Sequence, residues 1–187
     1  MDSFYTREEL EKIGFRELGN DVKISRYSCI YGAENISIGN HVRIDDFCRM
    51  SGKITIGNYV HISVYDALFG GSEGIVIEDF ANLSSRVSVY AQSDDYSGAE
   101  LTNSTIPDEY KKIISKPVKI ERHVIIGASS VVLPGVTLTE GTACGAMTLV
   151  NRSTEPWSIY IGIPARKMKE RKKELLEKEK IFLDSQQ

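Results

Sequence analysis

Three carboxylates lie close together in one polar stretch of the chain: Asp94, Asp95 and Glu100. A carboxylate beside an amine can orient it and relay its proton. Upstream, Ser84 carries a hydroxyl that could donate a hydrogen bond to a reacting carbonyl or to an acceptor. The stretch contains no histidine, the usual general base for a poorly acidic alcohol. The missing histidine favours chemistry on an amine over chemistry on a hydroxyl. A solvated loop, for the carboxylates, and a hydroxyl that only satisfies the backbone, for Ser84, are the structural alternatives.

A repeat of six residues dominates the part of the chain that must position these groups. From Ile120 to Glu155 the sequence divides into hexads without a slip, and the fifth place of each is small or β-branched. A helix repeats every 3.6 residues and a strand every two, so this period fits neither alone. It predicts a solenoid in which three hexads close a triangular coil. The first-place residues would stack inside it: Ile120, Ile126, Val132, Leu138, Cys144 and Val150.

The same period organises most of the remaining chain. Hexads begin at Leu18, and the Ile-Gly-Asn triplets at residues 38–40 and 56–58 are one full coil apart. Glycines in the insertion at residues 70–74 suit a bulged corner with positive φ. Residues 91–117 have no hexad register, and because coils flank both ends we expect a functional loop extruded from the solenoid.

Both ends of the chain are predicted to be helical. Thr6 and Glu9 form a capping box for a short helix that ends at Ile13 before Gly14. The stretch from Pro164 to Leu183 has proline in its first turn and oppositely charged pairs at helical spacing. We therefore predict a single domain, 1–187, with a cap at 1–17, a solenoid at 18–163 that carries the loop 91–117, and a C-terminal helix at 164–187.

The hexads, with IIGASSVVLPGV, GAMTLV and IGIPAR, resemble the hexapeptide-repeat acyltransferases over roughly residues 18 to 170. This resemblance implies an all-β fold, a left-handed parallel β-helix, with acyl-coenzyme A, foremost acetyl-coenzyme A, as co-substrate. It also implies a homotrimer in which the extruded loop completes the active site of a neighbouring subunit. The coenzyme would lie along Gly127, Ala128, Gly145 and Ala146, with its adenine and phosphates near Pro164, Ala165, Arg166 and Lys169. Small residues at tight corners are the structural alternative for the first four.

The serine-rich coil at residues 83–86 and the loop from Asp94 to Gly98 are similar to those of nucleotide-linked amino-sugar N-acyltransferases. The resemblance implies transfer of an acyl group to the amino group of such a sugar. We assign Asp94, Glu100 and Ser84 as candidate catalytic residues, and Asp95 and Tyr96 as candidate substrate-binding residues. Acylation of a sugar hydroxyl is the alternative. A zinc enzyme of the γ-carbonic anhydrase type is disfavoured, because His41, His61 and His123 do not share one hexad place.

Composition narrows the function classes further. The 187 residues carry a net charge of −3, with no basic stripe before the C-terminal tail, which argues against a nucleic-acid partner. No apolar run approaches the ~18 residues of a membrane span, and the N-terminus has no apolar signal region. The 3 cysteines form no CxxC motif, so we expect a reducing cytoplasm and no metal site.

Overall fold

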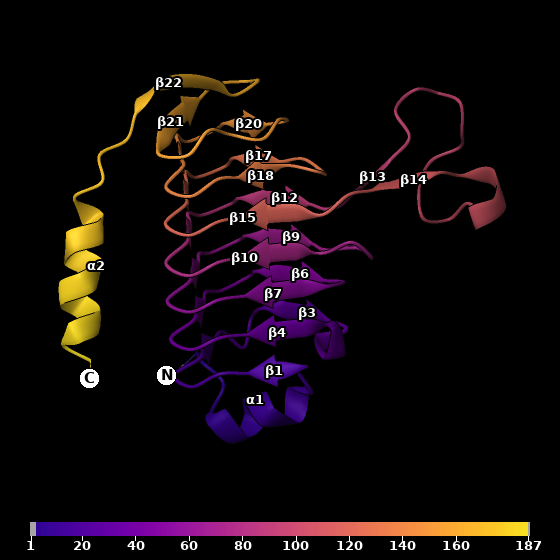
Figure 1. Cartoon of the computed structure of the whole chain (residues 1–187). Coiled ribbons are helices and arrows are strands. Elements are labelled where there is room, and N and C mark those ends of the chain that lie inside the picture. Colours follow the sequence, from indigo (N-terminus) through magenta and orange to yellow (C-terminus); the bar gives the residue numbers. More distant parts are fainter. Residues whose placement is uncertain (1–2, 187) are drawn as a thin grey trace.

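The computed structural model describes residues 3–186. They form a parallel β-helix with an N-terminal helix under its first coil, a C-terminal helix along its side and one protruding loop (Figure 1). Short strands from successive coils stack in register on three faces. The first-place residues of the hexads point inward: Ile120, Ile126, Val132, Leu138 and Val150 are all 0% exposed. Burial of these stacked aliphatic side chains drives the fold, and the predicted β-helix is confirmed.

Each face collects one strand from every coil. The first face is β1 (Glu17–Leu18), β4 (Ile36–Ile38), β7 (Ile54–Ile56), β10 (Ile75–Ile77), β15 (Val118–Ile120) and β18 (Thr137–Leu138). The second is β2 (Lys23–Ile24), β5 (Arg43–Ile44), β8 (His61–Ile62), β11 (Asn82–Leu83), β16 (Ile125–Ile126), β19 (Ala143–Cys144), β21 (Ser158–Ile161) and β22 (Arg166–Glu170). The third is β3 (Cys29–Tyr31), β6 (Arg49–Ser51), β9 (Ala67–Phe69), β12 (Ser88–Tyr90), β17 (Val131–Val132) and β20 (Leu149–Val150). We number the corners by the faces they join, so the second corner lies between the second and third faces.

The extruded loop leaves and re-enters the solenoid at the third corner, between the third and first faces. At its base, β13 (Gln92–Asp94) pairs antiparallel with β14 (Ile113–Ser115), and a 3₁₀ turn, η2 (Asp108–Tyr110), lies farther out. The backbone N–H of Lys116 donates to the carbonyl of Ala91 at 2.9 Å, which joins the two ends of the loop. The coils on either side still pair, β10 with β15 and β12 with β17. The predicted loop is therefore an insertion that does not interrupt the stack.

The N-terminal cap has the predicted form. Helix α1 (Arg7–Ile13) starts with a capping box between Thr6 and Glu9 and ends at Gly14, whose φ is 84°. Leu10 is 1% exposed and packs against the first coil. The helix thus covers the apolar end of the solenoid, which would otherwise face water. A second 3₁₀ turn, η1 (Ala33–Asn35), precedes β4.

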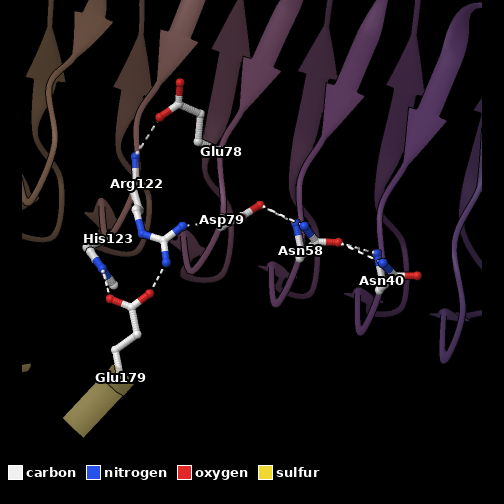
Figure 2. Close-up of polar contacts among 7 residues, drawn as sticks. All are labelled: Asn40, Asn58, Glu78, Asp79, Arg122, His123 and Glu179. Atoms are coloured by element: carbon white, nitrogen blue, oxygen red, sulfur yellow. Dashed lines mark hydrogen bonds and ion pairs between the residues drawn. The ribbon is translucent and has the colours of Figure 1, made fainter. Parts of the chain in front are cut away.

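A polar ladder runs along the first corner and ties successive coils together (Figure 2). The side-chain oxygen of Asn58 accepts from the backbone N–H of Asn40 at 2.8 Å and from its amide at 3.1 Å. Asp79 accepts from Asn58 in the same way, and its second oxygen accepts from Arg122 at 3.2 Å. These side chains satisfy backbone donors that the tight corner leaves unpaired.

Aromatic rings stack along the same corner, one from each coil. The ring centroids of His41 and Tyr59 are 4.6 Å apart, those of Tyr59 and Phe80 are 4.9 Å apart, and those of Phe80 and His123 are 5.4 Å apart. All four have φ between 55° and 60°, a region that bulky residues seldom adopt. Contact between neighbouring rings offsets the backbone strain that this corner imposes.

The C-terminal prediction was wrong in part. Residues Arg166–Glu170 form β22, which pairs antiparallel with β21, and helix α2 begins only at Leu175 and ends at Asp184. The spacing of charges in this segment was consistent with a helix. As a strand, however, it forms backbone hydrogen bonds with β21, which is already part of the second face. Residues 1, 2 and 187 of the predicted caps lie outside the described residues.

Helix α2 runs beside the solenoid and docks on the first corner (Figures 1 and 2). Its Glu179 binds both Arg122 and His123, the latter at 2.9 Å. Its Phe182 meets Tyr59 edge-on, with ring centroids 5.3 Å apart. His123 is consequently only 6% exposed.

Candidate active site

The residues predicted to bind the coenzyme form a continuous column at the second corner. The N–H of Ser84 donates to Ile126 O at 2.9 Å, and that of Gly127 to Cys144 O at 2.8 Å. The N–H of Gly145 continues the series to Tyr160 O at 2.8 Å. Ser84, Gly127 and Gly145 therefore lie one above another on successive coils, and the repeat predicted this stacking for Gly127 and Gly145.

Glycine at 127 has a structural reason as well as a possible functional one. A Cβ atom there would lie 2.5 Å from the backbone nitrogen of Ala146, so the next coil leaves no room for a side chain. At Gly145 the nearest atom would be the Cγ2 of Ile161, at 2.9 Å. Ala146 itself is exposed, and within residues 3–186 its backbone N–H donates to no protein acceptor. The column thus offers an open edge with a backbone donor for an extended, amide-bearing ligand.

The upper end of this column is built from the segment before β22. The N–H of Ala165 donates to Leu149 O at 2.8 Å, and the N–H of Leu149 donates to Gly162 O at 3.0 Å. Pro164 and Ala165 are half-buried, while Arg166 and Lys169 are exposed on β22. The predicted adenine-end residues therefore lie next to the glycine column, with two exposed basic side chains on a strand rather than on a helix.

Ser84 occupies the lower end of the column. Its neighbour Ser85 is engaged, with its hydroxyl 3.2 Å from that of Ser63 and its carbonyl accepting from Ser129 N at 3.0 Å. The hydroxyl of Ser84 makes no hydrogen bond to any described residue and is half-buried. It is thus available to donate to a ligand in the column.

Asp94 lies in a separate pocket of about 470 Å³ between the third face and the base of the loop. Phe69 and Tyr90 contribute stacked rings to its lining, with centroids 5.0 Å apart. The lining residues are Phe69, Tyr90, Gln92, Ser93, Asp94, Tyr96, Ile113, Val131, Leu133 and Pro134. A carboxylate among aromatic and aliphatic side chains suits a ligand with an apolar ring face and a cationic or hydrogen-bonding group.

Comparison with known proteins identifies the family. No family model matches the chain. Over 180 residues the chain is 47% identical to the dTDP-4-amino-4,6-dideoxy-D-glucose acyltransferase of Escherichia coli. The matched region covers 95% of this chain and 93% of that protein. The chain belongs to the nucleotide-linked amino-sugar N-acyltransferases. The resemblance stated from the hexads and the loop is therefore confirmed.

Solved structures agree with this N-acyltransferase assignment. AntD, an N-acyltransferase from Bacillus cereus in complex with dTDP and 3-hydroxybutyryl-CoA, matches with a TM-score of 0.97 and 53% identity, covering 100% of this chain and 99% of that one. The hexapeptide-repeat acetyltransferase VCA0836 from Vibrio cholerae matches with a TM-score of 0.56 and 22% identity, covering 89% of this chain and 80% of that one. The second likeness concerns the fold alone. The AntD complex contains an acyl-coenzyme A, 3-hydroxybutyryl-CoA, which is the class of co-substrate predicted from the sequence.

Three loop residues predicted for this N-acyltransferase have different surroundings. Both carboxylate oxygens of Asp95 accept hydrogen bonds within the loop, from the hydroxyl and N–H of Ser97 and from the N–H groups of Ala99 and Glu100. These bonds, with that from the Ser97 hydroxyl the strongest, lower the pKa of Asp95. Tyr96 lines the pocket although it is 92% exposed, and the side chain of Glu100 is exposed. Asp95 therefore shapes the turn that carries Tyr96.

Ser84 and Asp94 are not brought together within one chain of the N-acyltransferase. Ser84 lies at the second corner, before β12, and Asp94 lies in β13 at the third corner, after β12. The width of the third face separates them. Sequence reasoning also missed the aromatic lining of the pocket, although Phe69 and Tyr90 stand at equivalent places of successive coils, directly before the Gly70–Gly74 insertion and the loop.

The histidines of the N-acyltransferase do not converge. His61 Nε2 lies 2.8 Å from Asp45 on the second face, whereas His41 and His123 belong to the ring stack at the first corner. In the part of the chain that the structure describes, no group of three His, Cys, Asp or Glu side chains could hold a metal ion. Cys48 and Cys144 are buried, and burial raises the pKa of each thiol to about 12. No helix between residues 3 and 186 is long and apolar enough to cross a membrane.

Proposed function

We propose that this enzyme transfers the acyl group of an acyl-coenzyme A, foremost acetyl-coenzyme A, to the 4-amino group of dTDP-4-amino-4,6-dideoxyglucose. The relative from Escherichia coli acts on this sugar nucleotide, as its name states. Two features together carry the proposal. An unengaged serine, Ser84, lies at the lower end of the glycine column, and the loop pocket contains a carboxylate, Asp94, but no histidine. An amine needs no strong base, because a fair fraction of it is neutral near pH 8.

The reaction then follows from these groups. The amine nitrogen attacks the thioester carbonyl carbon, a C–N bond forms, and the C–S bond breaks to release the coenzyme A thiolate. Asp94 orients the amine and relays its proton, which the thiolate finally takes up. The Ser84 hydroxyl donates to the carbonyl oxygen as negative charge develops on it. Glu100 stands farther from the pocket and contributes charge to the loop.

A homotrimer is part of this proposal. In one chain the Ser84 column and the Asp94 pocket lie on opposite edges of the third face, so a neighbouring copy is needed to bring a carboxylate to a bound thioester. Closed threefold symmetry would make three equivalent sites of this kind. Light scattering at micromolar concentration should give three times the chain mass of 20.9 kDa, and a monomer would contradict the shared site.

We also place the enzyme in the cytoplasm, in a pathway that supplies modified sugars for polysaccharide synthesis. All its cysteines are free, and Cys29 is exposed, which suits a reducing compartment. A nucleotide-activated sugar is a typical donor for glycan assembly, so the acylated product would be consumed by a glycosyl-transfer reaction.

The decisive experiment compares matched acceptors. The purified enzyme is assayed with acetyl-coenzyme A and, separately, 3-hydroxybutyryl-coenzyme A, by following thiol release and product mass. The acceptors are dTDP-4-amino-4,6-dideoxyglucose and the dTDP-sugar with a hydroxyl in place of that amine. We expect turnover of the amino sugar only. Turnover of the hydroxy sugar alone would replace N-acylation by O-acylation, and the preferred acyl donor follows from the same assay.

A further inference from the structure

Asp66 is the only acidic residue among the buried side chains of residues 3–186, with 1% of its surface exposed. It belongs to an interior column at the second corner, between Cys48 in the coil below and Val87 in the coil above. The other buried places in this column hold Cys48, Val87, Ser130 and Thr148, which are uncharged. A carboxyl group at such a place costs free energy unless the protein satisfies it fully.

The two oxygens of Asp66 join two successive corners. Oδ2 accepts from the backbone N–H of Ser63 at 3.0 Å, in its own coil. Oδ1 accepts from the backbone N–H of Val87 at 2.8 Å, in the next coil. Val87 closes the corner that begins at Ser84. One carboxyl group therefore connects the corner that begins at Ser63 to the corner that carries the unengaged hydroxyl of Ser84, at the lower end of the glycine column.

Two further contacts act between the same corners. The N–H of Arg86 donates to Val64 O at 3.1 Å, and the hydroxyls of Ser63 and Ser85 lie 3.2 Å apart. Arg86 has a φ of 64°, so the turn after Ser85 is in a conformation that needs support from its neighbours. Asp66 binds Ser63 at the start of the lower corner and Val87 at the end of the upper one, and so braces the two corners between which these contacts form.

The coil two above Asp66 shows that folding alone does not require a carboxylate at this place. There, the hydroxyl of Ser130 accepts from the backbone N–H of Thr148 at 3.1 Å, the same contact that Asp66 makes to Val87. A serine thus performs the backbone part of the task without a buried acid. The Ser130 hydroxyl also donates to Gly145 O at 3.1 Å, so both of its bonds reach the next coil. What distinguishes Asp66 is that its second bond goes to Ser63 in its own coil, which stiffens the corner directly below that of Ser84.

We propose that Asp66 is a positioning residue that fixes the Ser84 corner so that the Ser84 hydroxyl points at the thioester carbonyl. This inference rests on the proposed function, because it assigns Ser84 to the reacting carbonyl. A hydrogen-bond donor to a developing oxyanion acts only when it is held within about 0.5 Å of its productive place. Loss of such a donor costs about 10²–10³ in kcat, and its displacement costs part of that.

The test is a double-mutant cycle. Asp66→Asn keeps the size of the side chain but presents an amide N–H to one of its two backbone donors, so one bond is lost. We expect kcat to fall about tenfold, with KM for acyl-coenzyme A changed less than about twofold. In a Ser84→Ala background the same substitution should cost less than about a further twofold, because residues that act through one group are not additive. Equal losses in both backgrounds would show a general structural role and overturn the proposal.

Two controls keep the result interpretable. Val60→Ala removes a buried side chain from the coil that holds Asp66, but at the first corner, and should leave kcat within about twofold. A crystal structure of Asp66→Asn should show the Ser84 hydroxyl displaced, and an unmoved hydroxyl would contradict the proposal whatever the enzyme acylates. Absence of wild-type transfer to the amino sugar would instead refute the proposed function, while the displacement of Ser84 still decides the role of Asp66.

Discussion

Glu179 Oε2 lies 2.9 Å from His123 Nε2, although the two residues are 56 positions apart in the chain. The same carboxylate binds Arg122, which also contacts Asp79 and lies over the ring of Phe80 at 4.9 Å. One side chain of α2 thus reaches the polar ladder and the ring stack of the first corner together. This contact fixes the position of the last helix on the solenoid.

We expect Glu179→Ala to release α2 without disrupting the β-helix. The loss of hydrogen bonds from two partners that are charged or partly buried should cost about 1–3 kcal/mol. Thermal unfolding measures this cost, and hydrogen exchange should show faster exchange in residues 175–184 than in the strands. Glu177→Ala, on the same helix but exposed, is the control and should change little. Equal effects of both substitutions would mean that helix propensity, not docking, was measured.

Asp94→Asn should reduce kcat/KM on the amino-sugar nucleotide about 10- to 100-fold, less than the largest effects of removing a strong general base. The amide keeps the shape of the pocket but cannot relay the proton. Ser84→Ala should lower kcat about 100-fold, at the lower end of the range for an oxyanion donor, Glu100→Gln should have a smaller effect, and His123→Asn should have little effect on turnover. Steady-state kinetics with both substrates varied separates these cases.

The neighbouring carboxylate provides the matched control for Asp94. Asp95→Asn should weaken the turn that Asp95 organises through Ser97 and Ala99, and so raise KM for the sugar nucleotide more than it lowers kcat. An Asp95 variant that lost kcat as strongly as Asp94→Asn, with KM unchanged, would exchange the two assignments.

A bulky side chain at Ala146 should block coenzyme binding along the glycine column and leave folding nearly intact. Ala146 is exposed, so Ala146→Phe meets no buried neighbour, and coenzyme A affinity measured by calorimetry should fall at least about tenfold, or 1.4 kcal/mol. Gly127→Ala makes a different prediction, because its Cβ would lie 2.5 Å from a backbone nitrogen. It should lower Tm as well as affinity, at a cost of about 1–3 kcal/mol. Unchanged affinity in Ala146→Phe would place the coenzyme elsewhere.

Asp66 should make stability fall with rising pH. Burial raises its pKa from 3.8 to about 8, so between these values the folded chain holds a proton that the unfolded chain has released. The contribution of this group therefore decreases from about pH 4 to pH 8, by up to about 1.4 kcal/mol per pH unit, and levels off above. Thermal unfolding from pH 5 to pH 9 should show a steeper decline for the wild type than for Asp66→Asn.

The titratable neighbours of Asp66 do not interfere in that range. Burial raises the pKa of the Cys48 thiol to about 12. Burial also acts to raise the pKa of Asp45, but hydrogen bonds from His61 and Arg43 outweigh it and leave that pKa below its usual value. Parallel curves for the wild type and Asp66→Asn would show that Asp66 stays ionised across the range.

The repeat made much of the fold predictable, because each hexad place has one physical environment. Ile126 had to point inward and Gly127 had to allow a close coil, and both do. The β22 strand was missed because its charged residues, Arg166 to Glu170, show no alternation and pair only through the backbone with β21. The partner of His123 was missed for a similar reason, since only the folded chain brings Glu179 to the first corner.

The site was predictable only in halves. The glycine column follows from spacing along the repeat, because equivalent hexad places must stack. The pocket around Asp94 combines a third-face stack, Phe69 and Tyr90, with loop residues that have no period. Nothing in the sequence alone fixes how such a loop folds back on the solenoid.

The hydrogen bond from Lys116 to Ala91 gives the loop the character of a cassette. Because the loop departs and returns at one point, its length and sequence can change without moving a strand of the solenoid. The glycine column, by contrast, is made of stacked positions such as Gly127, where a single added methyl group would collide with the next coil. If the sugar binds at this loop and the coenzyme along the glycine column, as we propose, selection can alter which sugar is acylated while the coenzyme site stays nearly fixed. One scaffold can then supply a series of enzymes that differ in acceptor but share a donor.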